Sequence, residues 1–402
     1  MHYTDSTDIK EQNPISTKQR PIRILHVVGG MNRGGIETWL MHVLRNIDRD
    51  RFQIDFLVHT EKPCPYDDEA RVLGSKIIPC LDPSKPWMYD RNFKRILREY
   101  GPYDIVHSHV HHFSGYVLRL SKQAGIPVRI AHSHTDNSSA EAKAGFYRRL
   151  YLTLTEWWIA RYATLGFGCS RKAAANLFSP SWESDPRWQL LYCGINLNPL
   201  RDRIDPVALR SELGIPSDAF VIGHVGRFAE PKNHLFLLEI AAEVAKHEPK
   251  MLLLLVGEGS LRPDIEQKVL QLGLIDRVIF AGVRPDVLHL MRGVMDVFLF
   301  PSLHEGLGLV LIEAQAAGLP CIFSNVVPEE ADVIKPLVQR ISLSQPVSDW
   351  VQAVLHQREM PSIITQSDGL TQVETSPFNI EISVKQLESI YQTQFTKEGI
   401  VV

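Results

Sequence analysis

Along most of this chain, hydrophobic and polar residues follow two patterns. Short apolar runs bounded by glycine or polar residues, such as 21–28 and 52–59, predict strands covered on both faces. Longer segments with one apolar face, such as 36–46, predict helices between them. This rhythm holds to Tyr192 and restarts at Phe220. We therefore expect an α/β protein with two domains, each built on a parallel sheet.

The boundaries of these domains follow from changes in composition. A polar stretch without periodicity predicts a disordered tail, and a segment rich in Asn, Pro and Arg predicts a linker. Another stretch, rich in Ser, Thr, Gln and Pro, predicts a mobile loop before a last amphipathic helix at 380–392. The expected organisation is a tail at 1–20, an N-terminal domain at 21–195, a linker at 196–204, a C-terminal domain at 205–375 and a mobile loop at 360–377.

Composition narrows the function classes. The 402 residues carry a net charge of −3, which argues against nucleic acid as the main partner. The sequence lacks an apolar run long enough to cross a bilayer, and its first residues lack the apolar core of a secretory signal. The five cysteines are scattered without metal-ligand spacing. We expect a cytoplasmic location.

One stretch, residues 298–320, combines a predicted strand, a glycine-containing loop and a helix at 309–317. Glu305 lies in the loop and Glu313 in the helix, and eight helical residues span about 12 Å. The free amides of the helix start attract anions. The spacing fits a nucleotide sugar, with sugar hydroxyls at Glu305, diphosphate at the amides and ribose at Glu313. It also fits two solvated carboxylates around a helix start, which the spacing alone favours.

The first strand is followed by a glycine-rich loop, residues 29–35. The loop does not match G-x-G-x-x-G, so it does not predict a dinucleotide site. Either a backbone amide of Gly34 or Gly35 faces an anion, or the loop is a tight turn without a ligand.

Together these motifs resemble the retaining GT-B glycosyltransferases of family 4. The resemblance rests on Gly226-Arg227-Phe228, Lys232-Asn233 and the E-x7-E stretch. Three N-terminal segments, 25–38, 104–109 and 129–135, are similar to the exopolysaccharide and capsule branch. The resemblance implies two Rossmann-like domains facing across a cleft, with a C-terminal helix, 380–395, packing back on the N-terminal domain.

The resemblance also implies roles for donor-side residues. Arg227 and Lys232 match the pair that binds the diphosphate, and two fixed cations would stabilise the leaving group without a metal. Glu313 matches the ribose carboxylate and Glu305 the carboxylate beside the sugar. The family usually has Asn where Cys193 stands, so the resemblance does not carry over a polar contact at this position. Backbone contacts to sugar, phosphate and base are implied for Gly306, Leu307, Gly308, Leu309, Val283 and Arg284.

Histidines gather near two predicted strand ends. His107, His109 and His111 alternate, so they share a face if the strand continues that far. A metal site is conceivable, but the sequence supplies no closed ligand set, and we expect no metal or other cofactor. The family position that matches His134 faces the reacting centre. We expect His134 to contact donor or acceptor, with His132 and His109 on the acceptor side; a structural role is the alternative.

The resemblance implies retaining transfer of a hexosyl unit from a nucleotide diphosphate sugar, with UDP as the expected carrier. The expected acceptor is a saccharide or lipid-linked saccharide in cell-surface polysaccharide biosynthesis. A catalytically silent nucleotide-sugar-binding subunit and a non-transferring GT-B enzyme such as an epimerase are the alternatives. In residues 143–161 aromatic and basic side chains alternate. They predict either peripheral contact with the inner membrane face or a buried helix with a basic outer face.

Overall fold

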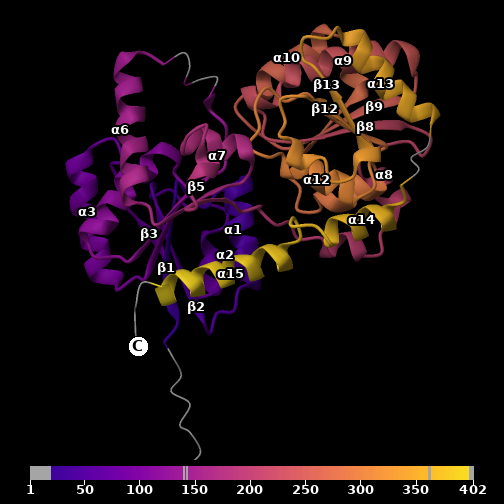
Figure 1. Cartoon of the computed structure of the whole chain (residues 1–402). Coiled ribbons are helices and arrows are strands. Elements are labelled where there is room, and N and C mark those ends of the chain that lie inside the picture. Colours follow the sequence, from indigo (N-terminus) through magenta and orange to yellow (C-terminus); the bar gives the residue numbers. More distant parts are fainter. Residues whose placement is uncertain (1–19, 139–140, 142–143, 361–363, 398–402) are drawn as a thin grey trace, which may run out of the picture.

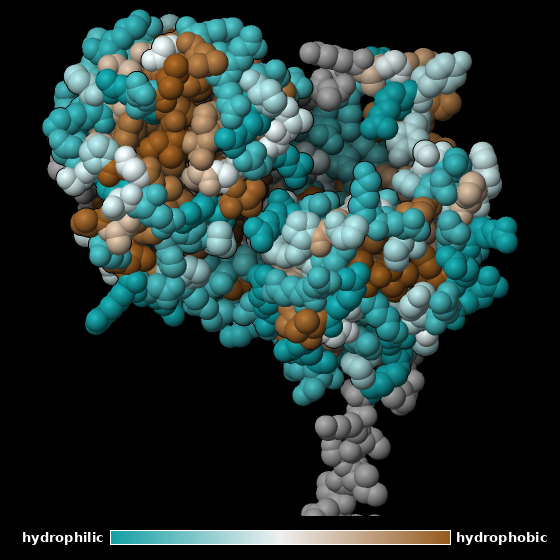
Figure 2. Space-filling view, turned by 180° about the vertical axis from the view of Figure 1, so that it is seen from behind, coloured by the Kyte–Doolittle hydropathy of each residue, from teal (hydrophilic) through white to brown (hydrophobic). Residues whose placement is uncertain are grey.

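The computed structural model describes residues 20–138, 141, 144–360 and 364–397. Most of the expected tail, residues 1–19, lies outside these ranges. The chain forms two lobes, each a parallel sheet covered by helices, as predicted (Figure 1). Seen from behind, the lobes are separated by a recess along part of their boundary (Figure 2).

The N-terminal sheet has the strand order β3-β2-β1-β4-β5-β6-β7, and every pair in it is parallel. The order reverses between β1 and β4, and ligands of such sheets bind at the carboxyl ends of the strands beside a reversal. The strands are β1 (Ile22–Val28), β2 (Phe52–Val58), β3 (Ile77–Pro79), β4 (Ile105–Ser108), β5 (Val128–Ser133), β6 (Leu165–Gly168) and β7 (Trp188–Leu190).

Helices cover both faces of this sheet because its strands are apolar on both sides. Trp39 and Tyr391 of the C-terminal helix belong to the core on one face, and Phe93 and Ile159 belong to the core on the other. The helices of this lobe are α1 (Gly35–Asn46), α2 (Asp67–Val72), α3 (Pro86–Tyr100), α4 (Ser114–Gln123), α6 (Phe146–Tyr162) and α7 (Arg171–Leu177).

The C-terminal sheet has the order β10-β9-β8-β11-β12-β13 and is also parallel. Its strands are β8 (Phe220–Val225), β9 (Met251–Val256), β10 (Val278–Gly282), β11 (Val297–Phe300), β12 (Cys321–Ser324) and β13 (Val338–Ile341). Its helices are α8 (Pro206–Glu212), α9 (His234–His247), α10 (Arg262–Gln271), α11 (Val287–Gly293), α12 (Leu309–Ala316), α13 (Val347–Glu359) and α14 (Gln366–Glu374).

The chain crosses between the lobes twice, and the crossings lie side by side. The Ile195 amide donates a hydrogen bond to the Phe378 carbonyl at 2.7 Å, and the Ile380 amide donates to the Ile195 carbonyl at 3.1 Å. From there α15 (Ile380–Lys397) runs under the N-terminal lobe and packs against α1 (Figure 1). The expected return of the last helix is confirmed, and it extends past the predicted end at 392.

One expectation was wrong, and the condition attached to another was not met. The predicted mobile loop at 360–377 contains α14, which begins at a capping box where Thr365 and Asp368 bond each other's backbone; residues 361–363 lie outside the described residues. The strand that carries His107 ends at Ser108. His111 has left-handed backbone (φ 48°) in a short 3-10 turn, so it does not continue the face of His107 and His109.

Candidate active site

The predicted strand, loop and helix around the E-x7-E stretch form β11, a loop and α12. Gly308 caps the helix in a left-handed conformation (φ 87°), which glycine adopts without strain. Gly306 lies against the N-terminal lobe: a Cβ atom there would be 1.9 Å from the His134 carbonyl oxygen. The loop therefore lies at the boundary between the two lobes.

Two predicted donor residues contact each other directly. The Lys232 ammonium donates a hydrogen bond to Glu305 Oε1 at 2.6 Å, although the two residues are 73 positions apart. The pair is largely shielded, with side-chain exposures of 22% for Lys232 and 9% for Glu305. The ammonium also lies 4.6 Å from the centre of the Phe300 ring. The pair presents a fixed cation and a fixed carboxylate at the loop.

Arg227, the second predicted cation, faces the N-terminal glycine loop. A Cβ atom at Gly34 would lie 3.3 Å from Arg227 Nη2 and 2.4 Å from Glu37 Oε2. Burial raises the pKa of Glu37, and the nearby Arg227 charge partly opposes that shift. Within the described ranges the Arg227 guanidinium has no carboxylate at ion-pair distance, which leaves its donors available to an anion. A Cβ atom at residue 34 would therefore require the ends of the Glu37 and Arg227 side chains to shift.

Glu313 is partly buried on α12, and burial raises its pKa to about 7. None of the hydrogen bonds between described residues involves its carboxylate, so its acceptor capacity is unused in this structure. A buried carboxylate without a partner is costly for stability and is typical of a site that binds a ligand.

The turn predicted to hold the base follows β10. Val283 is half exposed, at 51%. Arg284 bonds Asp286 and Glu212, which raises the pKa of its guanidinium. Its guanidinium is thus engaged within the C-terminal lobe, and a base contact from this turn stays a prediction.

The predicted histidines cluster at the ends of β4 and β5, but only one borders the lobe boundary. His134 is partly buried, with its carbonyl against Gly306. His109 and His132 are almost fully buried behind it, at 6% and 0% exposure. In this structure they support His134 rather than face the other lobe. A role for both on the acceptor side stays a prediction.

Two further members of this cluster were missed from sequence. His26 on β1 lies opposite His107 on β4 in the sheet register, so strand pairing is the signal that would reveal it. Tyr391 on α15 contacts His107 at 2.7 Å, and no sequence pattern indicates that contact.

Three hydrogen bonds join the lobes beside the site. Ser170 Oγ donates to the Gly306 carbonyl at 2.6 Å, the Arg171 amide donates to Glu330 at 2.6 Å, and Lys172 Nζ donates to the Val326 carbonyl at 2.9 Å. All three come from the start of α7. The two lobes are thus in direct contact beside the predicted site, an arrangement that we call closed.

Comparison with known proteins identifies the chain. Its residues 33–198 match the model described as Glycosyltransferase Family 4, and residues 207–366 match that of Glycosyl transferases group 1. It is 39% identical over 337 residues to the putative glycosyltransferase EpsF of Bacillus subtilis, covering 83% of this chain and 86% of EpsF. The chain belongs to the family 4, group 1 glycosyltransferases. The sequence-based assignment to family 4 is confirmed.

Two more relatives of this glycosyltransferase bear on its fold and function. The UDP-Gal:alpha-D-GlcNAc-diphosphoundecaprenol alpha-1,3-galactosyltransferase of Escherichia coli is 26% identical over 321 residues, covering 76% of this chain and 80% of that enzyme. The crystal structure of Anabaena HepE in complex with UDP and glucose superposes with a TM-score of 0.76 at 18% identity, covering 92% of this chain and all of that one. The latter likeness confirms the GT-B fold.

The helix α6 of the glycosyltransferase has an exposed apolar face. Its most exposed apolar side chains are Phe146 (76%), Tyr147 (86%), Leu150 (60%) and Trp157 (56%). Leu152 and Ile159 on the opposite face are buried in the N-terminal lobe. In the part of the chain described, no helix is both long enough and apolar enough to cross a membrane.

Among the described residues, three groups of side chains could in principle share an ion: His26 with His107 and His109; His109 with His132 and His134; His111 with His112 and Glu141. The nearest contacts within these groups, such as 2.8 Å between His26 and His109, are also ordinary hydrogen-bond lengths. The expectation that transfer needs no metal stays a prediction.

Proposed function

We propose that this glycosyltransferase is a retaining enzyme that transfers a hexosyl unit from a UDP-sugar to a hydroxyl of a saccharide or lipid-linked saccharide. The Lys232–Glu305 pair, at 2.6 Å and beside the closed lobe boundary, is the observation that carries the proposal. It supplies a cation for the diphosphate and a carboxylate for the sugar in one fixed unit.

The cations Arg227 and Lys232 act on the leaving group. When the bond between the anomeric carbon and the phosphate oxygen breaks, negative charge develops on the nucleotide diphosphate. Two positioned cations stabilise that charge in the transition state, and Arg227 has unused donors for the purpose. Transfer in this scheme needs no divalent metal.

Glu305 and Glu313 orient the donor at its two ends. Glu313 accepts hydrogen bonds from the ribose hydroxyls, which would satisfy its otherwise unpartnered carboxylate. Glu305, held by Lys232, accepts from a sugar hydroxyl rather than attacking the anomeric carbon. Gly34 and Gly35, with Gly306 to Leu309, offer backbone to phosphate and sugar.

Retention follows in this scheme from attack on the face that the phosphate leaves. The acceptor oxygen bonds the anomeric carbon, and its proton passes to the leaving diphosphate oxygen. The alpha linkage named for the product of the Escherichia coli relative supports this stereochemistry. The lobe contacts from α7 would exclude water and limit hydrolysis of the donor.

The proposed class of acceptor is supported by the acceptor named for one relative and by the exposed surface of α6. The Escherichia coli enzyme is named for a diphosphoundecaprenol acceptor, a lipid-linked sugar. The exposed aromatic face of α6 beside Arg148, Arg149 and Arg161 suits the lipid–water interface. We propose that the enzyme acts in cell-surface polysaccharide biosynthesis, at the inner face of the plasma membrane.

Two experiments test the proposal. In a thermal-shift screen of UDP- and GDP-sugars, a UDP-sugar at 100 times its dissociation constant should add about 2.7 kcal/mol of stability. Proton NMR of the product formed from that UDP-sugar should show the donor's anomeric configuration. Stabilisation by GDP-sugars alone, or an inverted product, would refute the donor or the stereochemistry respectively.

A further inference from the structure

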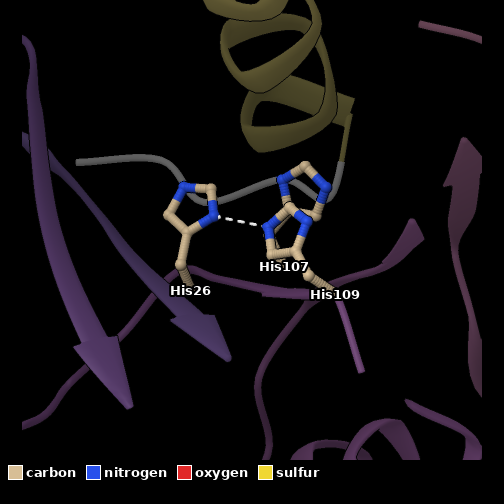
Figure 3. A group of neighbouring side chains, drawn as sticks. All are labelled: His26, His107 and His109. Carbon is tan, nitrogen blue, oxygen red and sulfur yellow. Dashed lines mark hydrogen bonds between the residues drawn. The ribbon is translucent and has the colours of Figure 1, made fainter. Parts of the chain in front are cut away.

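The histidines behind the site form one connected group around a tyrosine of α15. Five imidazoles and one hydroxyl are joined by hydrogen-bond distances, and Figure 3 shows three of the rings beneath a helix. The members are Tyr391, His26, His107, His109, His132 and His134. We call this group the histidine relay.

Two branches of the relay leave the Tyr391 hydroxyl. In the short branch the hydroxyl lies 2.7 Å from His107 Nδ1, and His107 Nε2 lies 3.2 Å from His132 Nδ1. In the long branch the hydroxyl lies 3.3 Å from His26 Nε2. Among the hydrogen bonds of the described residues, those of the Tyr391 hydroxyl alone connect the two rows of rings, although rings of the two rows also stack, as His107 and His109 do with centroids 4.3 Å apart.

The long branch ends at the lobe boundary. His26 Nδ1 lies 2.8 Å from His109 Nε2, and His109 Nδ1 lies 2.8 Å from His134 Nε2 (Figure 3 shows the first of these bonds). The other nitrogen of His134, Nδ1, has Cys193 Sγ as its polar neighbour at 3.7 Å among the described residues. A sulfur at that distance is a weak partner, so Nδ1 keeps capacity for a ligand.

All five rings are neutral near pH 7. Burial lowers the pKa of every one of them, to about 3 for His26 and His134, and nearby histidines lower the pKa further for the four rings other than His26. A neutral imidazole has one N–H donor and one bare nitrogen acceptor. Each ring inside the relay must therefore donate on one side and accept on the other.

Because of this rule, the direction of one hydrogen bond determines the direction of the next one along the relay. If His109 Nδ1 donates to His134, then His109 Nε2 accepts from His26, and His26 Nε2 accepts from the Tyr391 hydroxyl. The hydroxyl then accepts from His107 Nδ1, whose Nε2 accepts from His132 Nδ1. Every proton lies on Nδ1 in this arrangement, and reversing all the bonds puts every proton on Nε2. In a mixed arrangement the hydroxyl would accept from both His26 and His107, which leaves its buried O–H without an acceptor among the described residues. Only the two uniform arrangements satisfy all five contacts and also the hydroxyl donor.

We propose that Tyr391 and the histidine relay set the tautomer of His134, so that the C-terminal helix positions the hydrogen-bonding edge of the active site. In the all-Nδ1 arrangement His134 Nδ1 donates to a bound sugar, and in the all-Nε2 arrangement it accepts. This inference rests on the proposed function for its account of His134, whereas the shared tautomer follows from the relay alone. Tyr391 is a positioning residue, since it reaches the site only through other rings.

NMR of protein labelled with ¹⁵N-histidine tests the relay without any substrate. Long-range ¹H–¹⁵N spectra distinguish the protonated from the bare ring nitrogen, and single His→Gln variants assign the signals. We expect the same tautomer for all five rings. Different tautomers within the group, or a pattern that EDTA changes because a metal ion holds the rings, would overturn the relay.

The variant Tyr391→Phe removes the shared hydroxyl and keeps the ring. We expect the His134 signals to report a changed or mixed tautomer, and kcat for UDP-glucose hydrolysis, followed by UDP release, to fall about tenfold with KM nearly unchanged. His26→Phe should affect His134 and leave His132 unaltered. Unchanged His134 signals in both variants would overturn the proposal.

Ser383→Ala is the matched control. Ser383 lies on the same helix, is buried, and donates one hydrogen bond to the Tyr192 carbonyl at 2.9 Å, outside the relay. The Ser383→Ala variant should leave the histidine tautomers and kcat unchanged. A fall in kcat equal to that of Tyr391→Phe would mean that the packing of the helix alone matters, and would overturn the proposal. If the wild type hydrolyses no sugar nucleotide, the proposed function fails, while the substrate-free spectra still decide the relay.

Discussion

The variant Gly306→Ala should open the closed site without unfolding either lobe. The added Cβ would lie 1.9 Å from the His134 carbonyl oxygen and 2.7 Å from its carbon, where contacts below 3.0 Å are essentially never seen. Both atoms belong to the backbone, so no side chain can rotate away. The loop must therefore retreat from the N-terminal lobe by about 1 Å.

This retreat should reduce catalysis more than stability. It stretches the hydrogen bond from Ser170 Oγ to the Gly306 carbonyl, now 2.6 Å, and separates Glu305 from the donor's sugar. A misplacement of about 1 Å costs about 100-fold in rate. We expect kcat/KM for the UDP-sugar to fall by about that factor, measured as UDP release. Because Gly306 lies between the lobes and outside either core, the melting temperature should change by only a few degrees.

Gly29→Ala is the matched control, because a Cβ there would meet no atom within 4 Å. It should retain the wild-type rate. If Gly306→Ala keeps its kcat/KM within about twofold of the wild type, the closed arrangement is not the one in which transfer occurs, and the reasoning from lobe contacts is refuted.

Three further outcomes follow from the same site. Burial raises the pKa of Glu313 from 4.5 to about 7, so between these pH values the unfolded chain binds fewer protons than the folded one. The free energy of unfolding should therefore fall as pH rises through that window, by roughly 3 kcal/mol at most. Glu313→Gln should abolish this fall in urea titrations at pH 5 and 8, and an equal fall in the variant would contradict the assignment. Glu305→Gln should lower transfer by about 100-fold or more while UDP still binds; a fully active variant would exclude Glu305 from the reaction. Trp157→Ser with Phe146→Ser should reduce flotation with anionic vesicles, and a wild type that stays out of the lipid fraction would remove the membrane role of α6.

Local patterns predicted most elements of this fold. Apolar runs and glycine stops gave the strands and the start of α12, because both depend on neighbouring residues. The helix α14 was missed since its Ser- and Gln-rich composition indicates a loop, although Thr365 and Asp368 already have the spacing of a capping box. Whether His111 shares the face of His107 and His109 could not be predicted, because nothing in the sequence indicates where the strand ends or that the His111 backbone is left-handed.

The site was predictable only where a motif marks it. Glu305 and Lys232 were each expected at the donor, but their direct contact joins residues 73 positions apart and depends on the folded C-terminal lobe. The bond between Tyr391 and His107 spans 284 positions and depends on the return of α15. Such contacts are products of tertiary packing, which no local pattern encodes.

Calorimetric titration of UDP tests the donor site most directly. The wild type should bind UDP, and Arg227→Ala should weaken binding by about tenfold to 100-fold, the range for loss of a charge-assisted hydrogen bond. Both proteins should unfold at similar temperatures, because Arg227 is exposed and has no ion pair with a described residue. Equal UDP affinity in the two proteins would contradict the claim that the diphosphate lies between Arg227 and Lys232.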